Sequence, residues 1–497
     1  MDFDLFSIST ELILALGGIL TLAVGFVGRS RKRPYRIGII SPEVVALAVM
    51  AAALVPSIML IARTVFTHAR PETYQFGGLI ATDGLALFFK PIAIISTAIV
   101  MLLAIDYFRK IDIHRGEFYA LLVFATLAIT MLAGSTDLIM IYLSLEFLSL
   151  TSYILVGFLK RDTRSSEAAL KYFLFGSVAA AVMLYGMSII YGLTGTTSLS
   201  GVVSAFGGTL VPYPLLLMAT VFVLVGFGFK VAMVPFHQWS PDTYEGAPTP
   251  ITAFLSVGSK AAGFAVLVRV LATGIEPSII DWTPLIILLS AATMTVGNLI
   301  AIPQTNIKRM LAYSSIAQAG YLLLGIAAMP LSDRAVPAVL LYLLVYLFMN
   351  LGAFAVVTIL SARLRSDKIS DYAGLIHRSP AAAVCMAIFM LSLAGLPPTG
   401  GFVGKLYLFL AALDTGSTAL LWLAGIACVN TIISVFYYFN VVRTMFFLKP
   451  EEMSPIESSR PLGFVIALTT AVTFAVLFFP QPFIEIAHLS ASMLTGM

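Results

Sequence analysis

Four charged side chains lie inside long apolar stretches of this chain, at positions where a membrane would surround them with lipid. They are Glu146, Lys230, Lys260 and Lys405. A charge at the bilayer centre costs about 3 kcal/mol on insertion scales and roughly 10 kcal/mol or more in simulations, so such a charge is rarely kept without a use. Lysine and glutamate both bind and release protons, and the pattern therefore predicts a buried path for a small cation, with the proton favoured. Structural ion pairing is the alternative, but one carboxylate does not neutralise three lysines.

Other charges in apolar surroundings have simpler explanations beside the functional one. Lys171, in EAALKYFLF, either pairs with Glu146 or extends its ammonium group to the membrane surface. Lys90, in LALFFKPIA, is a weaker functional candidate, and extension of its ammonium group outward to the membrane surface is the alternative. We expect Arg269 to anchor the outer end of its helix and Asp83 to cap the start of another.

His237 has two open interpretations. It is either a neutral histidine hydrogen-bonded near the interface, or a proton relay between the cytoplasm and Lys230 or Lys260. Its ordinary pKa near 6.5 suits proton exchange at neutral pH. We expect Asp242 and Glu245, in the same PFHQWSPDTYEGAPTP segment, to be solvated or to cap a helix.

The composition identifies the elements that must hold these residues. Apolar residues make up 59% of the 497 residues and charged residues 11%, against roughly 25% charged in soluble domains. The mean hydropathy is +0.98. A spanning helix takes about 20 residues, so the chain is predicted to be an all-α integral membrane protein with about fourteen transmembrane helices. The expected spans are 9–28, 41–66, 79–105, 117–134, 137–159, 166–193, 212–239, 249–274, 283–303, 307–328, 335–362, 380–413, 418–447 and 461–480.

The sequence contains no motif for an energy source or a redox group. Cys385 and Cys428 sit in apolar runs, without a CxxC pattern or a His/Cys cluster, so no metal or iron–sulfur centre is expected. A P-loop, a dinucleotide fingerprint and haem ligands are also missing from the sequence. Moving one charge against 100 mV costs about 2.3 kcal/mol, so the energy is expected to come from partner proteins. The lipid bilayer is an expected partner, and nucleic acid is not.

Basic residues predict how the chain is oriented. Twenty lysines and arginines fall in or beside one set of loops, and three fall on the opposite side. By the positive-inside rule the first set is cytoplasmic, and both termini then face outward. The acidic start, MDFD, lacks the basic region of a signal peptide, so the first span is expected to be retained. The basic loops are 29–36, 109–115, 160–164, 308–309, 363–378 and 443–460; the opposite residues are Arg63, Arg70 and Arg334.

Two of the expected spans contain prolines that must break a helix. Pro397 and Pro398 lie inside the run 380–413, and Pro235 lies near the inner end of the seventh span. Proline lacks the backbone donor and clashes with the carbonyl one turn back. Broken helices occur at membrane depth only inside protein or beside a hydrated cavity.

The positions of these breaks suggest an internal repeat. Spans 4–8 and spans 9–13 form two five-helix units, and the broken helix is fourth in each. An odd number of spans inverts the second unit relative to the first, as in many transporters. Lys230 and Lys405 then occupy matching positions. The expected divisions are 1–116 for helices 1–3, 117–274 for the first repeat, 275–447 for the second and 448–497 for helix 14.

Three long segments resemble a known family along essentially the whole chain. GFGFKVAMVPFHQWSPDTYEGAPTPITAFLSVGSK, KRMLAYSSIAQAGYLLLG and LAGLPPTGGFVGKLYLF closely resemble the antiporter-like membrane subunits of respiratory complex I, a proton-pumping NADH:quinone oxidoreductase. The resemblance implies two inverted five-helix repeats and a proton-translocating role in a cell membrane. It also implies partner membrane subunits, with NADH, FMN, iron–sulfur clusters and quinone held by partner subunits. The implied proton-path residues are Glu146, Lys171, Lys230 and Lys260, with Lys405 on the exit side.

Within that family, the chain resembles the N-type branch. It has Lys405 where the M-type is expected to have glutamate, SPD after HQW, and no lateral helix after its last span. One alternative is a subunit of a multi-subunit Na⁺/H⁺ antiporter, which would share the fold and the lysines. Another is a stand-alone secondary permease, which would need a cavity with aromatic and hydrogen-bonding groups.

Overall fold

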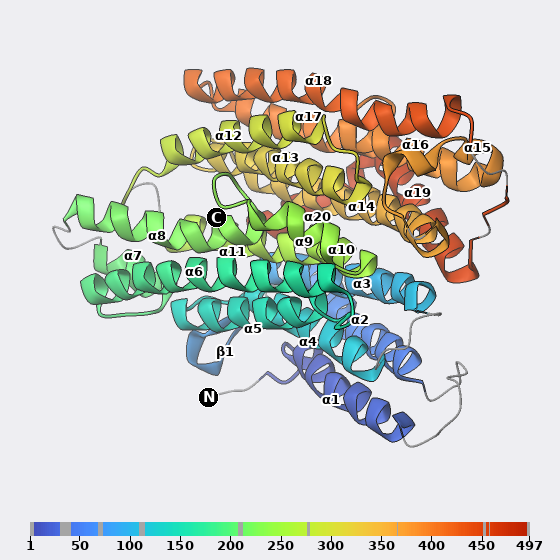
Figure 1. The fold of residues 1–497 in the computed structure, drawn as a ribbon. Coiled ribbons are helices and arrows are strands. Elements are labelled where there is room, and N and C mark those ends of the chain that lie inside the picture. Colours follow the sequence, from blue (N-terminus) through green and yellow to red (C-terminus); the bar gives the residue numbers. More distant parts are fainter. Residues whose placement is uncertain are drawn as a thin grey trace.

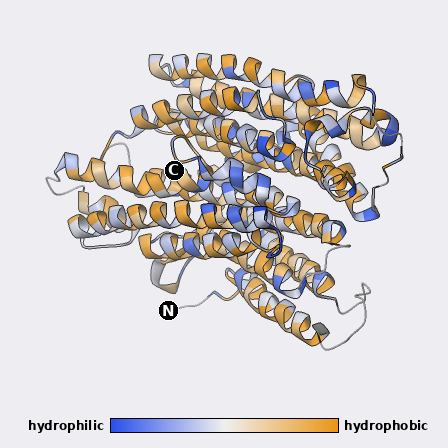
Figure 2. Cartoon of the chain, viewed as in Figure 1, coloured by the Kyte–Doolittle hydropathy of each residue, from blue (hydrophilic) through white to orange (hydrophobic). Residues whose placement is uncertain are grey.

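The computed structural model describes residues 4–29, 41–67, 73–108, 115–206, 212–275, 279–364, 366–450, 454–456 and 458–494. Most of the basic loop 29–36 lies outside these residues, as do Arg70, Arg109, Lys110 and Arg365. The described residues form an almost entirely helical bundle (Figure 1). Hydrophobic residues cover nearly all of its helices (Figure 2), as expected for a protein whose solvent is lipid.

Thirteen helical segments among the described residues are long and apolar enough to cross a membrane. This confirms the all-α membrane class, and each segment overlaps one of the expected spans. The segments are α1 (Ser9–Arg29), α2 (Pro42–Thr67), α3 (Gly84–Tyr107), α4 (Arg115–Gly134), α5 (Leu138–Val156), α6 (Thr163–Thr194), α8 (Tyr213–Val231), the run from α10 (Thr249–Phe254) to α11 (Lys260–Thr273), α12 (Thr283–Ala301), α13 (Ile307–Ala328), α14 (Ala335–Leu364), α18 (Thr418–Phe447) and α19 (Arg460–Phe478).

The remaining expected span, 380–413, is two short helices. α16 (Pro380–Ala394) ends before Pro397 and Pro398, and α17 (Gly400–Asp414) begins after them, so the predicted break is present. Gly395 ends α16 in the left-handed region, with φ of +80°, and its N–H bonds the carbonyl of Leu391. A side chain there would also collide with Lys405, whose Cδ would lie 2.6 Å from the added Cβ.

The seventh span differs from its expected limits. The helix α8 ends at Val231, four residues before Pro235, and Ala232 caps it with φ of +58°. The chain then runs without helix to α9 (Trp239–Gly246). The expected span 212–239 was therefore too long, because the break covers a whole segment around Pro235. The eighth span is also irregular, since a π-helical turn, η3 (Leu255–Ser259), separates α10 from α11.

Several short elements were not predicted. They are the antiparallel hairpin of β1 (Thr73–Gln75) and β2 (Ile80–Thr82), the turns η1 (Phe76–Gly78) and η4 (Ile369–Tyr372), and the helices α7 (Leu199–Phe206), α15 (Leu375–Arg378) and α20 (Pro480–Ser492). They carry turn or surface sequences without the long apolar signal of a span. α20 packs on α3 and α14.

The centre of the bundle is formed by the run α10–α11 together with α13 and α14. These helices are buried along nearly their whole lengths, whereas α1, α12, α18 and α19 expose much of their apolar surface. In Figure 1 the α9–α14 helices lie between α18 on one side and α1 on the other. A charged residue on the central helices is therefore enclosed by protein, which is where membrane proteins keep functional charges.

Candidate functional site

Lys230 lies beside the helix break, in the last turn of α8, and is 1% exposed. Its Nζ donates a hydrogen bond to Ser149 Oγ on α5, over 3.2 Å. Glu146 lies one turn before Ser149 on the same helix, interacts electrostatically with Lys230, and has a buried Oε1 without a hydrogen-bond partner among the described residues. The structure therefore brings Glu146 and Lys230 together without joining them in a direct ion pair.

Lys260 lies at the start of α11, directly after the π-helical turn, and is 3% exposed. Its Nζ donates to the backbone carbonyl of Ser315 on α13, over 2.7 Å. Tyr346 on α14 donates to the hydroxyl of the same serine, over 2.9 Å. His237, in the break before α9, lies close enough to Lys260 for an electrostatic interaction.

Lys405 lies in α17, just after the second helix break, and is 2% exposed. Its Nζ donates to the carbonyl of Ala394, the last residue of α16, over 3.1 Å. The same ammonium group lies 4.2 Å from the ring centre of Tyr321, a favourable cation–π geometry. In the described part of the chain, neither Lys260 nor Lys405 makes an ion pair, so their partners are neutral.

Polar side chains on α13 connect the surroundings of Lys260 to those of Lys405. Gln318, one turn after Ser314 and Ser315, donates to the carbonyl of Leu393, over 2.8 Å, and to the hydroxyl of Tyr438, over 3.2 Å. Tyr342 donates to the side-chain oxygen of Gln318, and Ser314 bonds Tyr438. Sequence reasoning missed these residues, although the polar run SSIAQ inside an apolar span was a usable signal.

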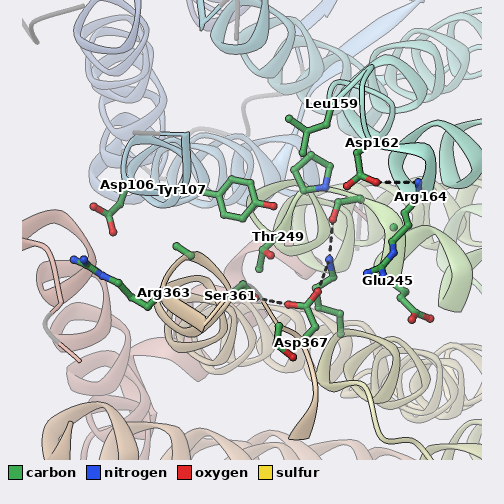
Figure 3. A pocket seen from close by; sticks show the side chains of 16 residues that line it. Asp106, Tyr107, Leu159, Asp162, Arg164, Glu245, Thr249, Ser361, Arg363 and Asp367 are labelled. Carbon is green, nitrogen blue, oxygen red and sulfur yellow. Dashed lines mark hydrogen bonds and ion pairs between the residues drawn. The ribbon is translucent and has the colours of Figure 1, made fainter. Parts of the chain in front are cut away.

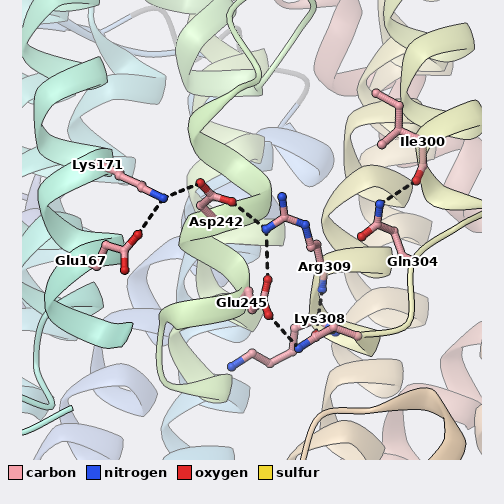
Figure 4. Close-up of polar contacts among 9 residues, drawn as sticks. Glu167, Lys171, Asp242, Glu245, Ile300, Gln304, Lys308 and Arg309 are labelled. Carbon is pink, nitrogen blue, oxygen red and sulfur yellow. Dashed lines mark hydrogen bonds and ion pairs between the residues drawn. The ribbon is translucent and has the colours of Figure 1, made fainter. Parts of the chain in front are cut away.

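Lys171 has partners other than Glu146. It is 40% exposed and pairs with Glu167 and with Asp242, each over 2.8 Å, and not with Glu146 (Figure 4). The reason is its position in the third turn of α6, where the side chain reaches the surface beside α9. Of the two interpretations, extension toward the surface describes its geometry.

Asp242 and Glu245 are partly exposed to solvent, as expected, and both also form ion pairs. Arg309, in the first turn of α13, bonds Asp242 over 2.6 Å and Glu245 over 3.0 Å (Figure 4). Burial alone would raise the pKa of Asp242, but hydrogen bonds from Lys171 and Arg309 lower it below its ordinary value. This ladder of charges joins α6, α9 and α13.

A polar cavity of about 590 Å³ opens beside this ladder, between the ends of α3, α6, α10, α13 and α14 (Figure 3). Acidic and basic side chains line it together, including Asp106, Asp162, Glu245 and Arg363. On its wall, Lys308 pairs with Asp367 over 3.3 Å and donates to the carbonyl of Ala247 over 3.0 Å.

Buried polar side chains gather on and around α9, and their polar atoms make no close hydrogen bond among the described residues. Buried polar groups in proteins normally bond to protein or to ordered water, so such a cluster is unusual. The cluster consists of the side chains of Tyr172, His237, Ser240, Thr243, Tyr244, Thr249 and Ser259. Tyr172 lies near Ser259 and Tyr244 near Ser240, so some of these hydroxyls face one another. Thr243 has no hydrogen-bond partner among the described residues. Most of these residues lie on α9 or next to it.

The other charges considered from sequence are buried in ion pairs. Lys90 is buried and pairs with Glu11 over 3.1 Å, so it does not extend outward to the membrane surface. Asp83 caps α3, as expected, by accepting from the N–H of Ala86. Arg269 does more than anchor a helix end, because it is buried and forms a bidentate ion pair with Asp83. Among the described residues, no group of three or more His, Cys, Asp or Glu side chains could hold a metal ion.

This arrangement defines a class of protein: a helical membrane bundle with buried lysines beside two helix breaks. Residues 135–434 match the family model described as NADH:quinone oxidoreductase/Mrp antiporter, TM. The chain is 43% identical to NADH-quinone oxidoreductase subunit N of Heliobacterium modesticaldum, over 99% of this chain and 100% of the relative. The chain belongs to this family of antiporter-like membrane subunits.

Two solved structures share the fold. A chain of respiratory complex I from Thermus thermophilus is 33% identical, with a TM-score of 0.78, and the match covers 96% of this chain and 99% of that one. A chain of the Mrp complex from a Dietzia species superposes with a TM-score of 0.82 at 21% identity, covering 99% and 98%. The second likeness shows the fold alone.

Proposed function

We propose that this chain moves protons across a cell membrane as the N-type subunit of an NADH:quinone oxidoreductase. The observation that carries the proposal is the set of three buried lysines, each held by a neutral acceptor. Hydroxyl and amide groups along α13 connect the surroundings of Lys260 to those of Lys405. The relatives named as subunit N support the assignment. The chain acts as part of a translocase, and electron transfer takes place in partner subunits.

The lysines are the carriers in this proposal, and Glu146 is the switch. A nearby carboxylate raises the proton affinity of a buried lysine, whereas burial lowers it. When the influence of Glu146 on Lys230 weakens, the lysine gives up its proton toward Lys260. Gln318, Tyr438 and their neighbours then connect Lys260 to Lys405, on the exit side.

Proton uptake is assigned to the polar cavity and the cluster of buried hydroxyls on α9. Thr249 lines the cavity, and Ser259 is the neighbour of Lys260. Groups such as Thr243 and Ser240 suit a chain of ordered waters that passes protons inward. His237 is the titratable group beside this route. Lys171 holds Asp242 by an ion pair near the end of the route at the protein surface.

The assembly and orientation complete the proposal. The partners are other membrane subunits of the complex, and subunits outside this chain hold NADH, FMN, iron–sulfur clusters and quinone. Residues 117–274 and 275–447 form two inverted repeats, flanked by helices 1–3 (1–116) and a C-terminal part (448–497). The basic loops face the cytoplasm and both termini face outward, consistent with the positive-inside rule.

The Na⁺/H⁺ antiporter alternative is less well supported. The Mrp chain is 21% identical to this one, whereas the N-type relative is 43% identical along its full length. Stand-alone permeation of a solute has less support, because charged residues of both signs, such as Asp106, Glu245 and Arg363, stand among the cavity's lining residues.

Substitution of Lys230 tests the proposal. In the assembled complex in membrane vesicles, Lys230→Ala should retain the subunit but lose most NADH-driven proton uptake, because the titratable group is gone. The matched control is Lys160→Ala, which removes an exposed lysine from a loop and should leave uptake unchanged. Unchanged proton uptake per electron and unchanged quinone reduction in Lys230→Ala would make this lysine merely structural.

A further inference from the structure

A buried ion pair between Arg269 and Asp83 lies at the end of α3 that is opposite the polar cavity. Arg269 on α11 is 2% exposed, and its NH1 and NH2 donate to the two carboxylate oxygens of Asp83 over 2.7 and 2.8 Å. Its Nε and NH2 also donate to the carbonyl of Ala133, near the end of α4, over 3.1 and 2.7 Å. One guanidinium group therefore joins α3, α4 and α11 at a single point.

This ion pair borders a second surface cavity. A hollow of about 290 Å³ is lined by Asp83 and Arg269 together with Ser200, Thr136 and Met493. Since α3 begins at Asp83 and its other end, at Tyr107, borders the polar cavity of Figure 3, the two cavities lie at opposite ends of that helix. The C-terminal helix α20 covers this end closely, because a Cβ on Gly84 would come within 2.4 Å of the carbonyl of Ser490.

Between this ion pair and Lys260, α11 offers no polar side chain. The intervening segment, AAGFAVLV (261–268), is apolar and buried throughout. Nine residues of helix span about 13 Å at 1.5 Å per residue. On α11 itself, an apolar segment that ends in a charge pair therefore leads away from Lys260. The buried hydroxyls of Thr97 and Thr126, on the neighbouring helices α3 and α4, bond each other over 2.9 Å.

We propose that the Asp83–Arg269 pair is a proton seal, which keeps Lys260 from exchanging protons with the second cavity. An arginine side chain holds its proton under all ordinary conditions, so it interrupts a chain of proton transfers where a lysine or histidine would continue it. Protons that reach Lys260 must then leave along α13 toward Lys405. This inference rests on the proposed function.

Removing both charges at once tests the seal. The double variant Asp83→Asn/Arg269→Gln leaves no unpaired buried charge, which a single substitution would create. In vesicles carrying the assembled complex, without NADH, an imposed pH gradient should decay several-fold faster than with the unsubstituted protein. With NADH, protons taken up per electron should fall while the uncoupled rate of NADH oxidation stays the same.

The matched control is Arg334→Gln/Asp414→Asn. It removes the same two charges from a half-exposed ion pair between the start of α14 and the end of α17, and should leave gradient decay unchanged. A gradient that persists equally long in the Asp83/Arg269 double variant would overturn the seal. The absence of NADH-driven uptake in the unsubstituted complex would instead contradict the proposed function, and the passive measurement separates the two results.

Thiol labelling tests the same idea with the ion pair intact. In a background with Cys385 and Cys428 replaced by alanine, Ser200→Cys lies in the cavity and Ala265→Cys lies behind the ion pair. A membrane-impermeant thiol reagent should modify Ser200→Cys and leave Ala265→Cys unmodified. Comparable labelling of both positions would mean that water passes the ion pair, and the seal would be wrong.

Discussion

The partners of the buried lysines separate the proposed proton carriers from charges held in direct ion pairs. Lys260 and Lys405 donate to backbone carbonyls, and Lys230 donates to a serine hydroxyl. When a lysine bonded to a neutral acceptor loses its proton, no unpaired charge remains in the protein interior. Lys90, which pairs directly with Glu11, would leave a buried carboxylate unpaired, and such a loss costs several kcal/mol. A lysine with a neutral acceptor can therefore gain and lose a proton, whereas a lysine in a buried ion pair keeps its proton.

At this scale, Glu146 gives the sharpest prediction. If its charge controls the proton affinity of Lys230, charge matters more than shape. Glu146→Asp should keep part of the activity, because the carboxylate remains although it is one methylene shorter. Glu146→Gln should be far worse despite being nearly isosteric, because Lys230 then keeps only the effect of burial.

The measurement is NADH-driven proton uptake in vesicles carrying each variant. Quinone reduction in the presence of an uncoupler serves as the control for assembly. Activity of Glu146→Gln equal to that of the unsubstituted protein would leave Glu146 as a residue that only packs α5.

At the scale of elements, the interrupted helices determine where a buried hydroxyl has no hydrogen bond within its own helix. In a continuous helix a buried serine or threonine usually bonds the carbonyl one turn back, as Thr358 does with Phe354 over 2.7 Å on α14. On the short helix α9, Thr243 is fully buried but makes no such bond among the described residues. Its hydroxyl is therefore available to a water molecule.

Thr243→Val tests this role of α9, since valine keeps the shape and removes the hydroxyl. If the hydroxyl holds water on the uptake route, proton uptake per electron should fall several-fold. The matched control is Thr358→Val, whose hydroxyl is satisfied within its own helix, and this variant should pump normally. Removing an unsatisfied hydroxyl from a dry core is neutral or stabilising. Normal pumping with a raised melting temperature in Thr243→Val would therefore show a dry site.

At the scale of the whole molecule, α13 couples the two halves. The carbonyl of Ser315 on this helix accepts a hydrogen bond from Lys260 of α11, and Gln318 donates to the carbonyl of Leu393 on α16. Its first turn carries Arg309, which pairs with Asp242 and Glu245 on α9 (Figure 4). A movement of α9 relative to α13 would thus change the uptake side and the link to Lys405 together.

Orientation in the membrane is the prediction that belongs to this scale. Cysteines in the 29–36 and 363–378 loops should react with an impermeant thiol reagent only from the cytoplasm, and those at 70–76 and 194–211 only from outside. Within the described residues, Lys368→Cys and Ser200→Cys are exposed examples of the two sets. The reason is the excess of lysine and arginine on one side. One inverted result would contradict the orientation and the count of fourteen spans.

The sequence by itself determined the membrane class, nearly all of the spans and both helix breaks. These features follow from local physics: apolar runs of about 20 residues require lipid, and Pro397 and Pro398 interrupt a helix wherever the fold places it. The buried charges were also visible, because Lys260 and Lys405 stand out from apolar neighbours. The extent of the break around Pro235 and the π-helical turn before Lys260 were not, because small backbone adjustments leave no periodic signal.

Only the tertiary structure decided which charges meet. Lys171 pairs with Asp242 and not with Glu146, because α9 turns back beside α6 after the break. Arg269 finds Asp83 across 186 positions of sequence, and Gln318 finds Tyr438 across 120. A single sequence does not show which residues pair across such separations. Every buried charge or amide needs a partner, and many candidates are present. The packing of the helices determines the partner, and it separates the proposed proton carriers from the proposed seal.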